Sequence, residues 1–195
     1  MVFLRLAGCN LRCPFCDTDF SASREMSGPE IIAALEAAGP GINRVCITGG
    51  EPSLQLDEPL IEALHQSGYR IHLETNGTRR IPAGVDWVTL SPKEDFCLSE
   101  PGKETSLPYA GVVLPRADEL KLVYTGANDP EKWLAFPADH YFLQPCDPGE
   151  ICPADGGEFR TLDEDVDTVA ATLRYTLSHP RWRLSLQTHK ILGIA

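Results

Sequence analysis

Three cysteines lie close together near the start of the chain, Cys9, Cys13 and Cys16, in the spacing C-x3-C-x2-C. Cysteine thiolates are the usual protein ligands of iron–sulfur clusters. Three thiolates leave one iron of a four-iron cluster without a protein ligand, so a small molecule can bind and be reduced there. A structural zinc site has four protein ligands, usually in two pairs, and no second pair stands at zinc-finger spacing here. The spacing therefore favours a [4Fe–4S] cluster over a zinc-binding module.

The composition narrows the class of protein. The 195 residues carry a formal net charge of −11, and an acidic surface repels phosphate backbones, so we expect no nucleic-acid partner. The sequence shows no apolar run long enough to span a membrane and no basic-then-apolar leader. Seven cysteines is an odd count, which in a chain without a signal peptide indicates reduced, metal-binding thiols. We therefore expect a cytoplasmic protein with no membrane contact.

Short apolar strands alternate with helices along the chain. The expected strands cover residues 2–6, 44–48, 69–74, 87–91, 119–124, 141–144 and 183–186. The expected helices run from a capping box at Ser27 and Glu30 to Gly39, over residues 59–66, and from a capping box at 161–164 through Val169, Leu173 and Leu177. This alternation predicts one α/β domain over 1–195, a partial, open (β/α) barrel of about six parallel strands. The irregular stretch at about 94–118 is expected to be an insertion or lid-like loop.

Polar residues follow nearly every expected strand. They form the runs Thr48-Gly49-Gly50-Glu51-Pro52, Glu74-Thr75-Asn76-Gly77-Thr78, Ser91-Pro92-Lys93, Gln144-Pro145-Cys146-Asp147 and Gln187-Thr188-His189-Lys190. Adjacent glycines allow close backbone approach to a ligand, and the carboxylate of Glu51 can meet an amine. Each run alone has a plain interpretation as a turn. Because ligands bind at the carboxyl ends of parallel strands, the runs and the cysteines together predict an active site.

These motifs resemble those of one family of radical S-adenosylmethionine (SAM) enzymes, the 7-carboxy-7-deazaguanine synthases. The cysteine spacing and the Gly-Gly-Glu-Pro run are typical of the superfamily. The resemblance to the family is carried by Arg5-Leu6-Ala7-Gly8-Cys9-Asn10, Cys16-Asp17-Thr18, Glu74-Thr75-Asn76-Gly77-Thr78, Ser91-Pro92-Lys93 and His189-Lys190. It covers nearly the whole chain.

The resemblance implies a carbon–nitrogen lyase of queuosine-type 7-deazapurine biosynthesis. Its substrate would be 6-carboxy-5,6,7,8-tetrahydropterin and its products 7-carboxy-7-deazaguanine and ammonia. The reduced cluster would cleave SAM, and the resulting 5′-deoxyadenosyl radical would take a hydrogen from the pterin carbon that bears the carboxylate and later return it. The cofactor carries this chemistry, so no side chain is assigned a catalytic role. The resemblance also implies Mg²⁺, a homodimer, and an electron donor such as flavodoxin or ferredoxin.

The family's binding positions map onto this sequence residue by residue. Cys9, Cys13 and Cys16 match the cluster ligands, and Thr18 matches the magnesium position, where a hydroxyl oxygen suits a hard cation. The positions that line SAM are Phe15, Cys16, Asp17, Gly49, Gly50, Glu51, Ser91, Pro92, Lys93, Gln144, Pro145, Cys146 and Asp147. The substrate positions are Arg5, whose guanidinium suits a carboxylate, together with Thr48, His189 and Ala195.

The sequence departs from the family at its front. Only eight residues precede Cys9, whereas the family usually has about twenty residues before the first strand, with a Gln-Gly-Glu-Gly stretch that contacts the pterin. A true start at Met1 would put the substrate and magnesium contacts in question, but not the cluster and SAM sites. Cys46, in an expected strand, is interpreted as a small buried hydrophobe. The irregular spacing of Cys97, Cys146 and Cys152 argues against an auxiliary cluster.

Two other classes of protein stay open at this point. A glycyl-radical-enzyme activating protein has the same cysteine spacing, but its substrate is a large protein partner. Pterin-dependent turnover of SAM supports the synthase, whereas a radical in a partner protein supports the activating protein. A non-catalytic zinc-binding module would be colourless after anaerobic purification.

Overall fold

The computed structural model describes residues 1–11, 13, 15–16, 18, 23–93, 111–126, 128–147 and 167–193, with only the backbone at position 189. Several positions discussed above lie outside these residues: Asp17, Cys97, Cys152, Ala195, the side chain of His189, and the expected capping box at 161–164.

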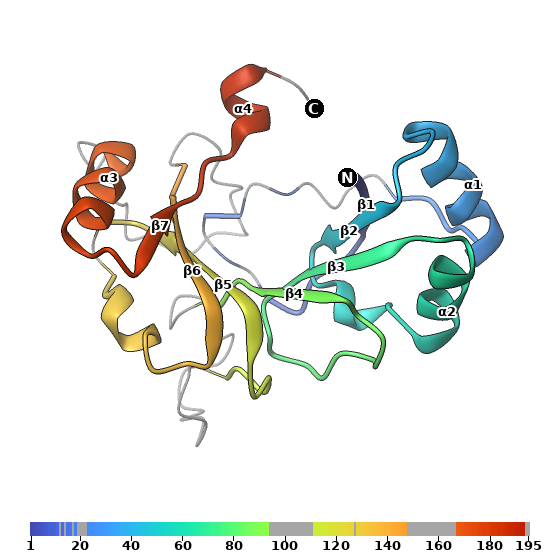
Figure 1. Ribbon diagram of the computed structural model, residues 1–195, viewed down its shortest axis with the longest axis horizontal. Helices are drawn as coiled ribbons and strands as arrows, with labels where there is room; N and C mark the ends of the chain where they lie inside the picture. The colour runs from blue at the N-terminus through green and yellow to red at the C-terminus, as the bar shows by residue number, and fades with distance from the viewer. Residues whose placement is uncertain are drawn as a thin grey trace, which may run out of the picture.

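Seven parallel strands form one sheet, and their order in space is their order in the sequence (Figure 1). They are β1 (Val2–Leu6), β2 (Arg44–Gly49), β3 (Arg70–Thr75), β4 (Trp87–Leu90), β5 (Ala117–Tyr124), β6 (Ala138–Pro145) and β7 (Trp182–Leu184). The expected parallel α/β sheet is confirmed. The count is seven rather than about six because the short β7 pairs with β6. Since β1 and β7 stand at opposite ends of this order, the sheet is open.

Helices cover the sheet at both of its ends. In Figure 1, α1 (Gly28–Ala38) and α2 (Glu58–Gln66) lie beside β1 to β3, and α3 (Thr168–Ser178) lies beside β6 and β7. Two short 3₁₀ turns, η1 (Pro52–Leu54) and η3 (Pro130–Trp133), and a last short helix, α4 (Thr188–Leu192), complete the described elements. Within the described ranges, no helix has the length and apolar content needed to cross a membrane.

Side-chain caps explain where the first two helices begin. The carboxylate of Glu30 accepts hydrogen bonds from the backbone N–H and the hydroxyl of Ser27, each at 2.7 Å, which satisfies the expected capping box. Asp57 caps α2 by accepting from the backbone N–H of Leu60 at 2.9 Å. These caps set where both helices enter the layer beside β1 to β3.

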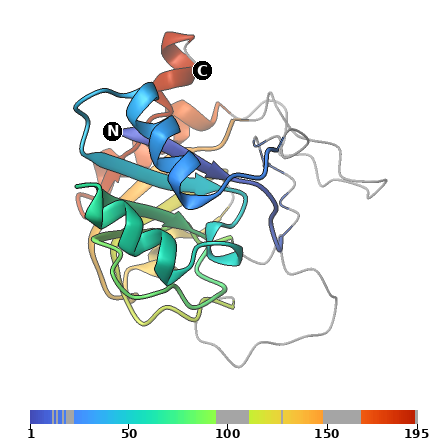
Figure 2. The same ribbon diagram turned by 90° about the vertical axis from the view of Figure 1, so that its right-hand side faces the viewer.

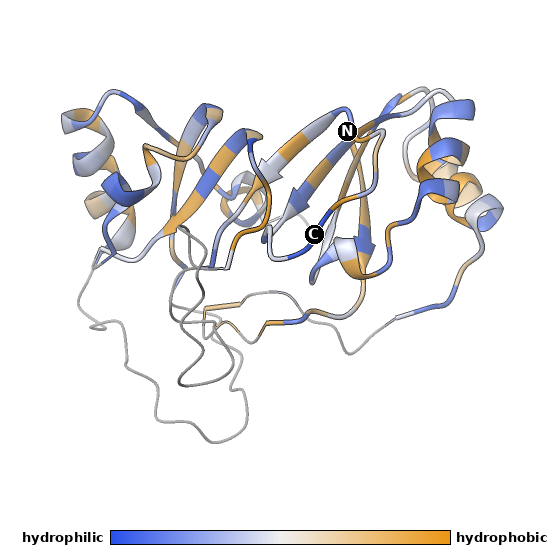
Figure 3. Cartoon of the chain, turned by 90° about the horizontal axis from the view of Figure 1, so that it is seen from below, coloured by the Kyte–Doolittle hydropathy of each residue, from blue (hydrophilic) through white to orange (hydrophobic). Residues whose placement is uncertain are grey.

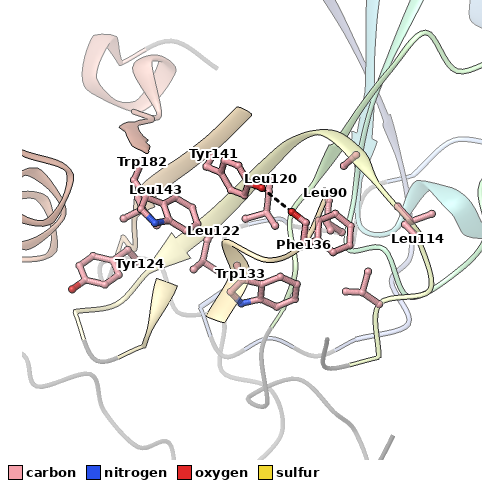
Figure 4. Packing of buried hydrophobic residues seen from close by; sticks show 12 residues of the cluster. Leu90, Leu114, Leu120, Leu122, Tyr124, Trp133, Phe136, Tyr141, Leu143 and Trp182 are labelled. Carbon is pink, nitrogen blue, oxygen red and sulfur yellow. Dashed lines mark hydrogen bonds between the residues drawn. The ribbon is translucent and has the colours of Figure 1, made fainter. Parts of the chain in front are cut away.

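The two ends of the sheet have separate hydrophobic cores. One packs α1 and α2 against β1 to β3 around Val45, Ile47, Ile71 and Leu73. The other joins β4 to β7 with η3, and its aromatic and leucine side chains are drawn in Figure 4. There the hydroxyl of Tyr141 donates to the backbone carbonyl of Phe136 at 2.7 Å. Figure 3 shows hydrophobic and hydrophilic residues alternating along the strands, so only one face of the sheet supplies these cores.

Helix α3 packs differently from what its apolar periodicity predicts. Its apolar residues Val169, Leu173 and Leu177 are exposed, Leu177 at 76%, whereas Thr168 and Thr172 are buried. The threonine hydroxyls bond to backbone carbonyls: Thr172 to Thr168 at 2.6 Å and Thr168 to Cys146 at 2.6 Å. Each buried hydroxyl therefore has a partner, and small β-branched side chains fit closely against β6. The start at Thr168, with Asp167 as the cap, also lies later than the expected one.

The predicted lid-like loop at about 94–118 is only partly described. In its described end, Val112 and Leu114 are buried in the β4 to β7 core, and the backbone N–H of Val113 donates to the carbonyl of Gly77 at 2.8 Å. Strand β5 already begins at Ala117. Val112 and Leu114 therefore pack this end of the segment against the core, while residues 111–116 form neither helix nor strand.

Candidate active site at the carboxyl ends of the strands

The segment that carries the cysteines leaves the end of β1 beside the end of β2. Figure 2 shows this segment continuing beyond the carboxyl ends of the strands. Three successive carbonyls of the segment accept hydrogen bonds from the run that follows β2. Gly50 N–H donates to the carbonyl of residue 6 at 3.1 Å, Glu51 N–H to that of residue 8 at 2.9 Å, and the side-chain amide of Gln55 to that of residue 7. The start of the cysteine loop is thus held by the Gly49–Gln55 segment.

The two glycines after β2 make this contact possible. A Cβ on Gly49, whose φ is +129°, would lie 2.0 Å from the carbonyl oxygen of Leu6. A Cβ on Gly50 would lie 2.0 Å from the carbonyl oxygen of Gly8 and 3.0 Å from the Cβ of Cys9. The predicted close backbone approach is therefore present, but here it is an approach to the chain's own cysteine loop. It places Gly49 and Gly50 directly beside the first cysteine.

The three cysteines lie in one loop and supply the number and kind of ligands that a [4Fe–4S] cluster with one open iron needs. Cys9, Cys13 and Cys16 are all partly exposed. The backbone N–H of Cys16 donates to the carbonyl of Cys13 at 3.1 Å, which forms a turn, and the N–H of Leu11 donates to Sγ of Cys9 at 3.4 Å. Burial raises the pKa of the Cys9 thiol, and the nearby charges of Cys13, Glu51 and Cys16 raise it further. Positive charge on a bound cluster would offset this repulsion.

A site for a single metal ion is not formed by the described residues. Zinc needs its ligand atoms gathered at about 2.0–2.3 Å from one point. Among the residues that the structure describes, no three His, Cys, Asp or Glu side chains are grouped so that they could hold one ion. This finding covers the three cysteines as well, so it does not separate a zinc site from a cluster site.

Glu51 lies inside the protein, and its carboxylate accepts bonds from the protein itself. The residue is 0% exposed. Oε1 accepts from the hydroxyl of Thr75 at 2.7 Å and from the backbone N–H of Ser53 at 3.0 Å, and Oε2 accepts from the backbone N–H of Asn76 at 2.7 Å. Its contact with an amine of SAM stays a prediction, because the structure shows these groups as its partners. Glu51 links the runs after β2 and β3.

Two predicted substrate positions lie side by side. Arg5 on β1 and Thr48 on β2 are register partners, so their side chains leave the same face of the sheet. Arg5 is exposed and its guanidinium carbon lies 5.9 Å from the ring centre of Phe3. Thr18, the predicted magnesium position, is partly exposed, and its carbonyl lies 4.0 Å from Sγ of Cys16. Arg5, Thr48 and Thr18 thus lie on β1, on β2 and in the cysteine loop that follows β1.

The remaining predicted SAM positions lie in the turns after β4 and β6. After β4, Ser91 N–H donates to the carbonyl of Thr75 at 2.8 Å, and Nζ of Lys93 donates to Oγ of Ser91 at 2.7 Å. After β6, the side chain of Cys146 is buried. Asp147 forms an ion pair of 2.9 Å with Lys190, which ties the turn to α4. Gln144 and Phe15 are partly exposed, whereas Pro92 and Pro145 are buried.

A polar face of the sheet was not predicted from the sequence. It consists of half-buried side chains on β3, β5 and β6 that point away from the helix-covered cores: His72, Glu74, Glu119, Lys121 and His140. Strands covered on both faces have nearly continuous apolar runs. The alternation His-x-Glu in β3 and Glu-x-Lys in β5 was the signal, and it indicates one open, polar face.

Two networks organise this polar face. Nζ of Lys121 donates to Glu74 at 2.7 Å, and although burial opposes ionisation of Glu74, this ion pair outweighs it and lowers the pKa of the carboxyl. Thr89 donates to Glu119 at 2.6 Å and lies 2.7 Å from the ring of His72. Burial lowers the pKa of His72 even though Glu119 lies nearby. The charged side chains of this face are therefore hydrogen-bonded to one another or to Thr89, within the strands and before their carboxyl ends.

Comparison with known proteins identifies the family. The family model described as the radical SAM superfamily matches residues 4–94. The 7-carboxy-7-deazaguanine synthase of Bacteroides thetaiotaomicron is 40% identical over 193 residues, which is 99% of this chain and 87% of the relative. The enzyme of the same name from Caulobacter vibrioides is 40% identical over 99% of this chain and 89% of its own length. The chain belongs to the 7-carboxy-7-deazaguanine synthase family.

Solved structures agree at the level of the fold. The crystal structure of QueE from Escherichia coli has a TM-score of 0.61 at 23% identity, over 95% of this chain and 84% of that chain. Streptococcus suis SuiB bound to its precursor peptide SuiA has a TM-score of 0.60 at 15% identity, over 94% of this chain and 48% of that one. The predicted partial (β/α) barrel of radical SAM type is confirmed. As a radical SAM enzyme, a member of this synthase family uses a [4Fe–4S] cluster and SAM.

Proposed function

We propose that the protein converts 6-carboxy-5,6,7,8-tetrahydropterin into 7-carboxy-7-deazaguanine and ammonia, a step toward queuosine-type nucleosides. The proposal is supported by relatives named 7-carboxy-7-deazaguanine synthase, which are 40% identical over 99% of the chain. The structural observation that carries it is the contact of Cys9 with Gly50, because this contact joins the cysteine loop to the glycine turn. When bound together, the cluster and SAM supply a carbon-centred radical that can take a hydrogen from the pterin.

The three cysteines would hold the cluster. The backbone of Gly49, Gly50 and Glu51 lies beside the first of them and would receive the methionine part of SAM. The turns Ser91–Lys93 and Gln144–Asp147 would line the rest of SAM, together with Phe15 to Asp17. These turns follow β2, β4 and β6, which all end at the same edge of the sheet.

Substrate recognition is proposed for Arg5 and Thr48, with His189 and Ala195 near the carboxyl terminus. Arg5 and Thr48 lie on neighbouring strands in register, so one carboxylate of the pterin can meet a guanidinium and a hydroxyl on the same face. The positive charge would orient the substrate, since paired N–H donors of a guanidinium match a carboxylate.

Magnesium is proposed to bind with the substrate. Mg²⁺ prefers octahedral oxygen coordination, and it keeps several waters when the protein supplies few ligands. The hydroxyl of Thr18 is one neutral oxygen, so the pterin carboxylate would complete the site. Thr18→Ala should leave cluster absorbance and SAM binding unchanged, lower turnover, and reduce the stimulation of turnover by added Mg²⁺. Wild-type magnesium dependence in this variant would refute the assignment of Thr18.

The cellular setting follows from the same proposal. A one-electron donor such as flavodoxin or ferredoxin would reduce the cluster, the protein would act in the cytoplasm, and two copies would form a homodimer. Sedimentation of the anaerobic protein would test the dimer.

A direct test is whether cleavage of SAM depends on the pterin. The reduced, cluster-loaded protein should form 5′-deoxyadenosine much faster with 6-carboxy-5,6,7,8-tetrahydropterin than without it. The proposal would be overturned in favour of an activating protein if the rate of SAM cleavage did not depend on the pterin and a glycyl radical formed in an added glycyl-radical enzyme.

A further inference from the structure

A closed ring of side-chain hydrogen bonds connects the cysteine loop to the turn after β3. Asn76 Nδ2 donates to Oδ1 of Asn10 at 3.1 Å, Asn10 Nδ2 donates to Oγ1 of Thr78 at 2.8 Å, and Thr78 Oγ1 donates to Oδ1 of Asn76 at 2.7 Å. Each of the three side chains donates once and accepts once within the ring. Asn10 directly follows Cys9, and its two ring partners lie 66 and 68 residues away in sequence.

The buried carboxylate of Glu51 anchors the turn after β3, which carries two members of this ring. It accepts from the hydroxyl of Thr75 and from the backbone N–H of Asn76, which fixes the turn that carries the ring. The hydroxyl of Thr75 also accepts from the backbone N–H of Gly77 at 3.1 Å. Bonds to a buried, charged carboxylate are stronger than neutral ones. The β3 turn is therefore a rigid platform, and Asn10 is the side chain of the cysteine loop that reaches it.

Among the described residues, the hydrogen bonds from the Gly49–Gln55 segment reach the cysteine loop on the side before Cys9. The bonds from Gly50, Glu51 and Gln55 end at residue 8. The ring through Asn10 holds the side after Cys9. Cys9 is thus bracketed by two anchors, one on the run after β2 and one on the run after β3.

We propose that Asn10 is a positioning residue: by bonding to Asn76 and Thr78 it fixes Cys9, and with it the cluster, relative to the glycine turn that receives SAM. The inference rests on the proposed cluster and SAM positions. A hydrogen bond between neutral side chains is modest, so its loss should leave the fold intact. The position of Cys9 relative to Gly50 would vary more, because one of its two anchors among the described residues is lost.

The variants Asn10→Ala and Thr78→Val test the ring. Thr78→Val keeps the shape of the side chain and removes the hydroxyl, and Gln66→Ala, which removes an exposed side-chain bond to Glu62 on α2, is the matched control. In the cluster-free protein, hydrogen exchange at the amide of Leu11, which donates to Sγ of Cys9 on the side that the ring holds, should be about fivefold faster in Asn10→Ala, as expected for the loss of one hydrogen bond. The control should exchange at the wild-type rate.

Readouts on the loaded protein separate positioning from general stability. In Asn10→Ala, chelators should remove iron several times faster, and the electron paramagnetic resonance signal of the reduced cluster should change less on addition of SAM. The KM for SAM should rise several-fold while the midpoint of urea unfolding stays at the wild-type value. In the double variant Asn10→Ala/Thr78→Val, iron release and the KM for SAM should match those of the more strongly affected single variant, since both substitutions break the same ring.

Two results would overturn the inference. One is wild-type rates of hydrogen exchange and iron release in Asn10→Ala. The other is a double variant in which the effects of the two single variants on iron release and on the KM for SAM add, which would mean that the two side chains act separately. Neither result depends on the pterin, so the inference can fail while the wild-type protein still makes the deazaguanine acid. Conversely, the exchange result can hold even if the proposed reaction is wrong.

Discussion

Cys13 and Cys46 are cysteines of one chain in opposite surroundings. Cys13 is partly exposed in the loop between β1 and α1, whereas Cys46 lies buried in β2. Burial, together with the nearby charge of Glu74, raises the pKa of Cys46 to about 12, so its thiol stays protonated in this environment. Its interpretation as a buried small hydrophobe agrees with this environment.

Cys13→Ala should therefore abolish the visible absorbance of the iron–sulfur cluster and all cleavage of SAM, because two thiolates do not hold a four-iron cluster. Cys46→Ala is the matched control and should keep both, at a cost in stability of about 1 kcal/mol for the small cavity. Anaerobic reconstitution followed by absorbance and 5′-deoxyadenosine assays would measure this. Equal loss in the two variants would contradict the ligand assignment.

The ion pair of Glu74 with Lys121 predicts a pH-dependent stability. The side chains are 30% and 19% exposed, so Lys121→Met at neutral pH leaves a largely buried carboxylate without its partner and should cost about 1–3 kcal/mol. The pKa of Glu74 lies below its ordinary value of 4.5. The stabilisation is therefore present above pH 4.5 and is lost as the pH falls through the lowered pKa.

Urea unfolding of both proteins at several pH values would test this. The difference between wild type and Lys121→Met should be largest near neutral pH and shrink below 4.5, the ordinary pKa of the group. Glu74→Gln in the Lys121→Met background should recover part of the loss. A difference that does not change with pH would show that lost packing, rather than charge, explains the effect.

Single residues also mark the limit of what the sequence could predict. The position of Glu51 next to two glycines indicated a ligand-facing carboxylate. The amino-acid sequence around it does not show that Ser53, Thr75 and Asn76 would be its hydrogen-bond donors. Thr75 and Asn76 lie in a different βα unit. Partners from distant parts of the chain become visible only once the strands are in register.

Among the elements, the turn after β2 depends most on the identity of its residues. A Cβ at Gly50 would overlap the carbonyl oxygen of Gly8 at 2.0 Å, whereas a Cβ at Gly28, in the first turn of α1, would meet nothing within 4 Å. Gly50→Ala must therefore displace the cysteine loop. Gly28→Ala places a better helix former in open space.

Gly50→Ala should lower the free energy of unfolding by about 1–3 kcal/mol, as overpacking does, and should reduce cluster loading sharply. Gly28→Ala should change the free energy of unfolding by less than about 1 kcal/mol, because the better helix propensity of alanine is opposed by its contact with the following Pro29. Urea unfolding and iron content of the reconstituted variants would measure both effects. Full cluster loading in Gly50→Ala would contradict the close packing of this turn on the loop.

The elements themselves were largely predictable, because strand and helix periodicities and the caps are local signals. All seven expected strand segments are present, and the capping box of Ser27 and Glu30 starts α1 as expected. The orientation of α3 was not predictable in the same way. Its apolar stripe through Leu173 faces outward, since threonine hydroxyls with backbone partners can be buried in place of apolar groups.

For the whole molecule, the strand order explains why distant motifs form one site. The strands are parallel and follow the sequence order, so the runs after β1, β2, β3, β4 and β6 all reach the same edge of the sheet. The sequence predicted this convergence from the alternation of strands and helices. It singled out Arg5, Thr48 and Glu74 one by one, but it did not predict that they and the charged side chains of β5 and β6 form one polar face.

The central claim is that this site contracts the ring of a carboxylated pterin. The most direct measurement is anaerobic incubation of the cluster-loaded protein with SAM, a reductant, Mg²⁺ and 6-carboxy-5,6,7,8-tetrahydropterin, followed by mass analysis. We expect 7-carboxy-7-deazaguanine and ammonia in equal amounts, and neither with the Cys13→Ala variant. Cleavage of SAM by the wild-type protein with the pterin recovered unchanged would contradict the claim.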